Sequence, residues 1–205
     1  MTTFDIPMSA EAEDRAETDI RDFLTLWVGL LADRKYAEAL DLLSPEIPRG
    51  SGSVDSRKIP HWTPSLLEAV IANYGTPEPV LNPPMPQSYA VAPLDSELRG
   101  AFEANVSIDF DRSAISGLDR SPISPEAKRP QGNKKIGWLS TKLAQLGRSR
   151  SAAKSGKTPW LGGADFQLPL NFQRGNDLSD LSARMRFKPV TKTEMVLVLL
   201  DIHVL

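Results

Sequence analysis

The closing stretch, Ser179–Leu205, constrains the fold most, because apolar and polar residues alternate along it. Every second residue from Leu181 to Phe187 is apolar, which is the period of a strand with one buried face and one wet face. A second run begins at Glu194 and is apolar on both faces at first, then on one face. Because Val190–Thr193 joins the two runs, the sequence predicts an antiparallel hairpin whose second strand lies inside a sheet.

Apolar pairing across this hairpin predicts its register. The expected pairs are Phe187 with Val196, Met185 with Val198, Ala183 with Leu200, Leu181 with Ile202, Asp180 with His203 and Ser182 with Asp201. A slip of one residue would set arginines opposite valines. A carboxylate facing an imidazole, here Asp180 and His203, is the core of many general-base arrangements. A cross-strand ion pair is the simpler interpretation, and we favour it because no nucleophile motif accompanies the pair.

Amphipathic helices precede the strands. The expected helices are one that Ser9 caps and that breaks at Asp33–Arg34, a short one at Tyr36–Leu43, and one that begins at Thr63–Pro64 and ends at Gly75. Two further strands are expected at Phe102–Asp111 and Phe166–Phe172, with Pro169 marking an edge or a bulge. Helices gathered before strands predict an α+β fold, in which N-terminal helices pack on a curved, mainly antiparallel sheet that ends in a C-terminal β-hairpin.

Charge and proline are distributed unevenly along the chain. Residues 1–111 hold 8 Lys or Arg and 19 Asp or Glu, whereas residues 112–160 hold 11 and 2. Ten of the 17 prolines fall between residues 45 and 93. We therefore expect one α+β domain over residues 1–205, with a proline-rich connection at 45–100 and a basic, partly flexible insert at 112–160 that includes a short helix at Trp138–Leu146.

Few motifs point to catalysis or to a cofactor. Asp109 and Asp111 share a face of their expected strand and are candidates for a pair of acid–base carboxylates. We favour the simpler interpretation, a solvated strand face. His61, beside Trp62, is typical of a packing or capping residue, and two histidines without cysteine give no transition-metal spacing. The run Ser151–Thr158 departs from a phosphate-binding P-loop at its first glycine and lacks the flanking strand and helix. We expect no cofactor and no metal.

The composition also bears on location and partners. No apolar run approaches the roughly 20 residues that span a bilayer, and residues 1–10 lack the regions of a secretory signal. The basic insert could contact nucleic acid, but the acidic remainder would repel phosphate, so we favour a solvated loop or a contact with an acidic protein surface. We expect a cytoplasmic protein without a membrane partner, and a homo-oligomer stays open.

Several segments carry a resemblance to a known superfamily. A long helix through Phe23–Trp27 is followed by Asp33–Leu40, which holds an aromatic residue, and by Leu43–Pro45. With the closing hairpin, these features resemble the nuclear transport factor 2-like superfamily, a cystatin-like α+β cone shared with ketosteroid isomerases and polyketide cyclases. The ending Asp201–Val204 is also similar to that of small bacterial proteins, some of which have immunity functions in toxin systems. The resemblance implies helices packed in the concave face of a curled sheet.

We interpret the chain as a non-enzymatic protein-binding module, with an immunity protein that neutralises a cognate bacterial toxin as the specific expectation. Complementary charge would speed association with a basic toxin domain. The expected partner-binding residues are acids of the first helix, Glu11, Glu13, Asp14, Glu17, Asp19 and Asp22. A solvated helix face is the simpler account of these acids. The alternative function is a small-ligand binder or an isomerase- or cyclase-like enzyme that uses the cone cavity, with Asp109, Asp180 and His203 as catalytic candidates.

Overall fold

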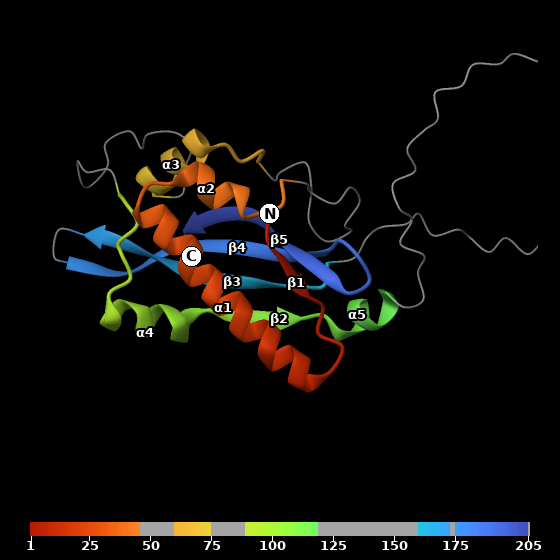
Figure 1. Ribbon diagram of the computed structural model, residues 1–205. Coiled ribbons are helices and arrows are strands. Elements are labelled where there is room, and N and C mark those ends of the chain that lie inside the picture. The colour runs from red at the N-terminus through yellow and green to blue at the C-terminus, as the bar shows by residue number, and fades with distance from the viewer. Residues whose placement is uncertain (46–59, 75–88, 119–159, 173–174, 205) are drawn as a thin grey trace, which may run out of the picture.

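Five antiparallel strands form one curled sheet, in the order β1-β5-β4-β3-β2 (Figure 1). The computed structural model describes residues 1–45, 60–74, 89–118, 160–172 and 175–204. The strands are β1 (Thr3–Asp5), β2 (Ser107–Phe110), β3 (Gly162–Phe172), β4 (Gly175–Pro189) and β5 (Glu194–Val204). The closing hairpin is therefore β4 and β5, and β5 lies between β4 and β1 inside the sheet, as the sequence predicts.

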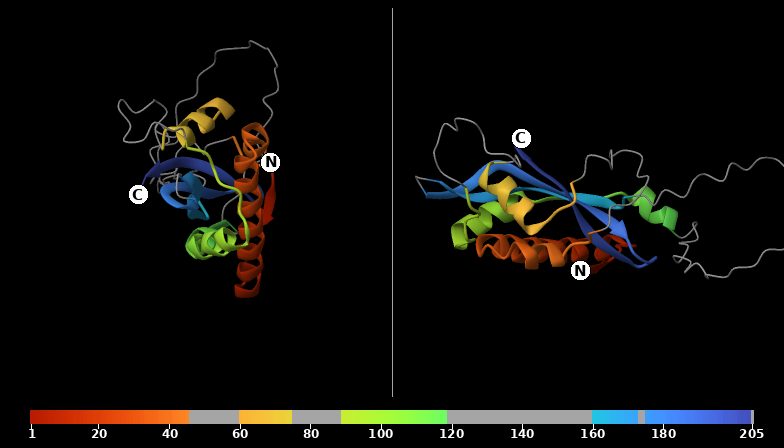
Figure 2. Two further views of the ribbon diagram at one scale, coloured as in Figure 1. Left: turned by 90° about the vertical axis from the view of Figure 1, so that its left-hand side faces the viewer. Right: turned by 90° about the horizontal axis from the view of Figure 1, so that it is seen from above.

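Helices cover one side of this sheet. They are α1 (Ala10–Ala32), α2 (Tyr36–Asp41), α3 (Pro64–Ala72), α4 (Ser96–Asn105) and α5 (Arg112–Leu118). Figures 1 and 2 show α1 running along the sheet, with α3 and α4 on either side of it. The predicted caps are present, because the Ala12 amide donates to Ser9 Oγ at 3.3 Å and the Leu66 amide donates to Thr63 Oγ1 at 3.2 Å. The predicted α+β fold is confirmed.

Aromatic side chains fill the space between α1 and the sheet. Trp27 of α1 meets Phe166 of β3 edge to face, with ring centroids 6.0 Å apart, and Phe102 of α4 meets the same ring at 5.7 Å. Toward the other end of the sheet, Phe110 stacks on Phe187 at 5.2 Å. Such pairs add to the stabilisation from apolar burial. The interior beneath α1 is thus occupied by side chains.

The predicted hairpin register is wrong by one residue near the turn. Phe187 pairs with Leu197 rather than with Val196. The reason lies in the turn, where Thr191 Oγ1 accepts hydrogen bonds from the amides of Thr193 at 3.2 Å and Glu194 at 2.9 Å. With these bonds, Pro189 pairs with Met195, so the pairing closes one residue later on β5 than the expected register, which would pair Pro189 with Glu194. The face of β5 that packs in the core therefore begins with Met195, Leu197 and Leu199, not with the alternate residues.

A β-bulge then adds a second shift. The partner of Met185 is Leu199, but the partner of Arg184 is Asp201, so Leu200 is the extra residue on β5. Beyond the bulge, His203 pairs with Ser182. The predicted opposition of Asp180 and His203 is therefore wrong.

The strand predicted at Phe102–Asp111 begins later than expected, because its first four residues belong to α4. Asp95 caps α4, because its Oδ1 accepts from the amides of Glu97 at 3.2 Å and Leu98 at 2.9 Å. Leu98 and Phe102, one turn apart, are the buried residues of this helix. Strand structure begins only at Ser107, which reduces the predicted strand to β2.

Other predictions have mixed outcomes. The pairing of β3 with β4 shifts between Gln167 and Pro169, which confirms the bulge expected at the proline. The strand β1 is not anticipated by the sequence analysis. The helix expected at Trp138–Leu146 and the P-loop-like run Ser151–Thr158 lie outside the described residues. Within the described ranges, no helix is long and apolar enough to cross a membrane.

Candidate functional site

The face of the sheet that turns away from the core carries polar side chains of the three long strands. We call this set the polar sheet face, and the register places on it Asp165 and Gln167 of β3, Ser182, Arg184 and Arg186 of β4, and Asp201 and His203 of β5. Residues that alternate with them, such as Met185, belong to the core. The two faces therefore differ sharply in chemistry.

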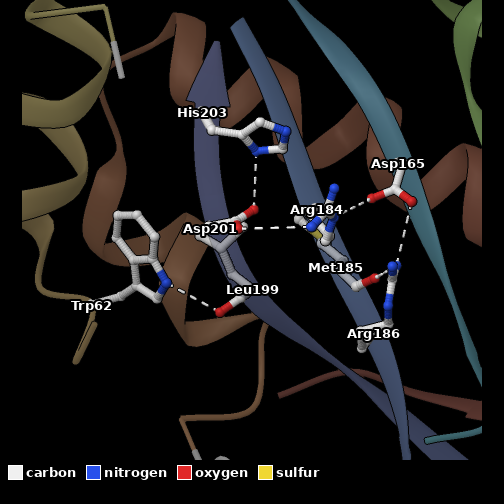
Figure 3. Close-up of polar contacts among 8 residues, drawn as sticks. All are labelled: Trp62, Asp165, Arg184, Met185, Arg186, Leu199, Asp201 and His203. Carbon is white, nitrogen blue, oxygen red and sulfur yellow. Dashed lines mark hydrogen bonds and ion pairs between the residues drawn. The ribbon is translucent and has the colours of Figure 1, made fainter. Parts of the chain in front are cut away.

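One row of charges crosses this face from β3 to β5. Arg184 Nε donates to Asp165 Oδ1 at 3.2 Å, and Arg184 Nη1 lies 4.0 Å from Asp201 Oδ2. The other carboxylate oxygen of Asp201 is 3.1 Å from His203 Nδ1 (Figure 3). These side chains are 34–46% exposed, so solvent screens the pairs and each contributes less than about 1 kcal/mol. Their main effect is to orient the guanidinium and the imidazole.

Arg186 lies across a glycine on the neighbouring strand. Its Nη1 donates to Met185 O at 2.9 Å and to Asp165 Oδ2 at 3.4 Å. The register partner of Arg186 is Gly163, and a Cβ atom at that glycine would overlap with the guanidinium. Glycine at position 163 therefore leaves the space that Arg186 occupies, and both oxygens of Asp165 are bonded to arginine.

A groove of about 200 Å³ opens on the polar sheet face. It is lined by Asn105, Asp165, Phe166, Gln167, Ser182, Arg184 and His203. Asn105 Nδ2 donates to Gln167 Oε1 at 3.0 Å, and the Gln167 amide donates to Asn105 Oδ1 at 2.9 Å. Gln167, Ser182 and His203 form one cross-strand row, so the short serine lies between two longer side chains.

Two serines of β4 form a matched pair for judging this groove. Ser179 and Ser182 are 4% and 5% exposed, respectively. Ser179 Oγ donates to Leu168 O at 2.7 Å and accepts from the Leu181 amide at 3.1 Å. Ser182 Oγ, in contrast, has no hydrogen-bond partner among the described residues. A buried hydroxyl without a partner costs folding free energy, so Ser182 is not explained by stability.

The two serines are therefore expected to respond oppositely to alanine. Ser179→Ala should lower the free energy of unfolding by about 2 kcal/mol, because it leaves a buried carbonyl and a buried amide without their partner. Ser182→Ala should leave it unchanged or raise it by up to about 1 kcal/mol. Urea denaturation followed by tryptophan fluorescence measures both. Equal losses in the two variants would contradict the assignment of Ser182 Oγ as unpartnered.

The catalytic candidates from the sequence are not brought together. Asp180 is exposed. Burial raises the pKa of Tyr74, and the negative charge of Asp180 raises it further. Asp109 is exposed on β2 opposite Gly163. Asp111 caps α5, where hydrogen bonds from Ser113 and Ala114 lower the pKa of its carboxyl. Asp109 and Asp111 therefore do not form an acid–base pair.

His203 retains a carboxylate neighbour, but from its own strand. Asp201, two residues before it, holds the imidazole through Nδ1. His61 lines a small cavity with Val198, Leu199 and Trp62. The indole of Trp62 donates to Leu199 O at 3.0 Å (Figure 3). The two histidines therefore occupy different sites.

The structure divides the predicted partner-binding acids of α1 into two groups. Glu13 is paired with Arg112 of α5 at 2.8 Å, and Glu17 with Arg21 at 2.7 Å. The remaining acids, Glu11, Asp14, Asp19 and Asp22, are exposed and have no ion pair within the described part of the chain. Leu26, one turn after Asp22, is 57% exposed.

The groove is not predicted from the sequence, although part of it can be recognised there. The alternation along β4 places Ser182 and Arg184 on the wet face, but the neighbours that complete the groove come from β3, β5 and the end of α4. In the described ranges, no group of three or more His, Asp or Glu side chains could hold a metal ion.

No protein-family model, no curated protein and no solved structure matches the chain.

Proposed function

We propose that the chain is a non-enzymatic module that binds a basic protein partner through α1. The observation that carries this proposal is the outer side of that helix, which we call the acidic face and define as Asp14, Asp19, Asp22 and Leu26. Each step of four residues turns only about 40° around an α-helix, so Asp14, Asp22 and Leu26 lie along one ridge that winds over its outer side. An exposed leucine at the end of a line of unpaired acids is suited to a contact with both charged and apolar parts.

The chemistry of the acidic face defines the partner class. Unpaired carboxylates steer an approaching cationic surface and speed its association, most strongly at low ionic strength. A basic toxin domain is the partner that we propose, with this chain as the immunity protein that blocks it. The aromatic filling around Trp27 and Phe166 supports a surface interaction rather than a small-ligand enzyme, because the space that such an enzyme would use is occupied.

Charge reversal tests this proposal. A pull-down with the tagged full chain at low salt identifies the basic partner, and the variant Asp14→Lys/Asp19→Lys/Asp22→Lys should bind it at least ten-fold more weakly. The loss should shrink as salt is raised, because screening weakens the steering by these carboxylates. Isothermal titration calorimetry at two salt concentrations measures both effects. Co-expression should show that the wild-type chain, but not the variant, relieves toxicity of the partner.

A matched variant controls for net charge. Glu38→Lys/Glu68→Lys/Glu97→Lys changes three exposed acids of α2, α3 and α4 by the same total charge. At the higher salt concentration it should bind the partner within about two-fold of wild type, because screening there limits the effect of charges outside the contact. Equal weakening by the two triple variants would show that overall charge, and not the acidic face, governs binding. Unchanged affinity in the α1 variant would overturn the proposal.

A further inference from the structure

The groove on the polar sheet face has more free hydrogen-bond donors than acceptors. Among the described residues, Arg184 uses only Nε in a hydrogen bond, and Ser182 Oγ and the Gln167 side-chain amide donate to nothing. Asp201 engages Nδ1 of His203, which leaves the other ring nitrogen, and Figure 3 shows that nitrogen on the side of the ring away from Asp201, toward β4.

The acceptors of the same groove are already engaged. Both oxygens of Asp165 accept from arginines, at 3.2 Å from Arg184 and 3.4 Å from Arg186. The side-chain oxygens of Asn105 and Gln167 accept from each other's residue. A ligand that entered here would therefore have to supply acceptors.

We propose that this groove binds a small oxyanion, a carboxylate or phosphate group, between Gln167 and His203. The oxyanion would accept from Arg184 and, when both imidazole nitrogens of His203 carry a proton, from the nitrogen that does not face Asp201. Such charge-assisted contacts are the ones that oxyanions favour. Two arginines and two aspartates nearly balance in charge on this face, so the donors and their orientation select the ligand rather than a net positive field. This inference concerns the sheet face and does not rest on the function proposed for α1.

The buried hydroxyl of Ser182 is a further donor that an oxyanion could use. The hydroxyl has no partner in the part of the chain that the structure describes, and it lies between the two longer side chains of its row. Because the hydroxyl is covered in the free chain, its contact with an oxyanion requires the side chains of its row to part. Binding would then satisfy a donor that the folded chain leaves unpaired.

Histidine NMR offers a direct test, because the chain contains two histidines and only His203 lines the groove. The full chain is titrated with sodium phosphate and, separately, with sodium acetate, against sodium chloride at matched ionic strength and pH. The imidazole signals of His203 should shift saturably with at least one oxyanion, and those of His61 should not. The tighter of the two oxyanions identifies whether the site prefers phosphate or carboxylate.

Three variants assign the binding to the groove. Arg184→Gln should weaken binding of the oxyanion about ten-fold and Ser182→Ala about five-fold, since each substitution removes one hydrogen-bond donor. Arg99→Gln, at an exposed position of α4 outside the groove, should leave affinity unchanged. Thermal unfolding checks that each variant is folded. The proposal is overturned if neither oxyanion shifts His203 beyond chloride, if both histidines shift alike, or if Arg184→Gln and Ser182→Ala bind as wild type does.

Discussion

Replacing Trp27 by alanine is expected to lower the free energy of unfolding by about 3–5 kcal/mol. The Trp27 side chain is fully buried and meets the ring of Phe166 edge to face. Its indole Nε1 also donates to Ala39 O at 3.1 Å, which ties α1 to α2. The substitution removes a large apolar volume from a packed interior, and it leaves the Ala39 carbonyl without its partner. Urea denaturation followed by far-ultraviolet circular dichroism measures the loss.

The neighbouring position provides the control for this experiment. Leu26→Ala, one residue earlier on the same helix, should change the free energy of unfolding by less than about 0.5 kcal/mol, because Leu26 is 57% exposed. The same substitution should weaken binding of the basic partner if the acidic face is the contact surface. Comparable destabilisation by the two substitutions would mean that α1 does not pack on the sheet through Trp27.

The interior is filled with side chains, whereas two faces of the molecule expose polar groups. Trp27, Phe102 and Phe166 fill the space between α1 and the sheet. The outer side of α1 and the polar sheet face lie on opposite sides of that packed layer, so the two proposals can be tested separately. A variant of one surface is expected to leave the other unchanged.

The fold class can be predicted from the sequence because its signals are local. The helical period of α1 and the caps at Ser9 and Thr63 depend on residues within a turn or two. The alternation along β4 likewise requires only neighbours in sequence. Each of these features appears in the structure where the sequence places it.

The register of the hairpin could not be predicted in the same way. Val196 and Val198 on one face of β5 and Leu197 and Leu199 on the other are all buried, so apolar residues face β4 in either register. Alternation alone therefore does not choose between the two pairings. The choice depends on the Thr191 hydroxyl in the turn and on the bulge at Leu200, which the hydrophobic pattern does not reveal.

The candidate sites divide along the same line. The acids of α1 could be placed on one helix from the sequence, but the ion pairs of Glu13 and Glu17 depend on where Arg112 and Arg21 extend. The groove is formed by residues of three strands in a particular register. The sequence places each of these residues on a strand, but it does not predict that they lie side by side. At α4, the alternation from Phe102 onward suggested a strand, whereas Asp95 starts a helix.

Alanine at position 162 is expected to lower the free energy of unfolding by about 3 kcal/mol. Gly162 begins β3 with φ of +127°, a conformation that side chains strongly disfavour, and an added Cβ would overlap with the carbonyl of Asp109 on β2. Relief of that overlap requires β2 to separate from β3, which would disturb the contact of Phe110 with Phe187. Urea denaturation measures the loss, and hydrogen exchange should show faster exchange of the β2 amides.

A second glycine makes the comparison decisive, because the same substitution there should have the opposite sign. Gly100 lies within α4, and an added Cβ would meet nothing within 4 Å. Gly100→Ala should therefore raise the free energy of unfolding by about 0.5–1 kcal/mol, since alanine favours helix and restricts the unfolded chain. If both variants were stabilised, Gly162 would not be held in its left-handed conformation against β2. If both were destabilised alike, loss of glycine itself, and not the close approach of β2 and β3, would explain the effect.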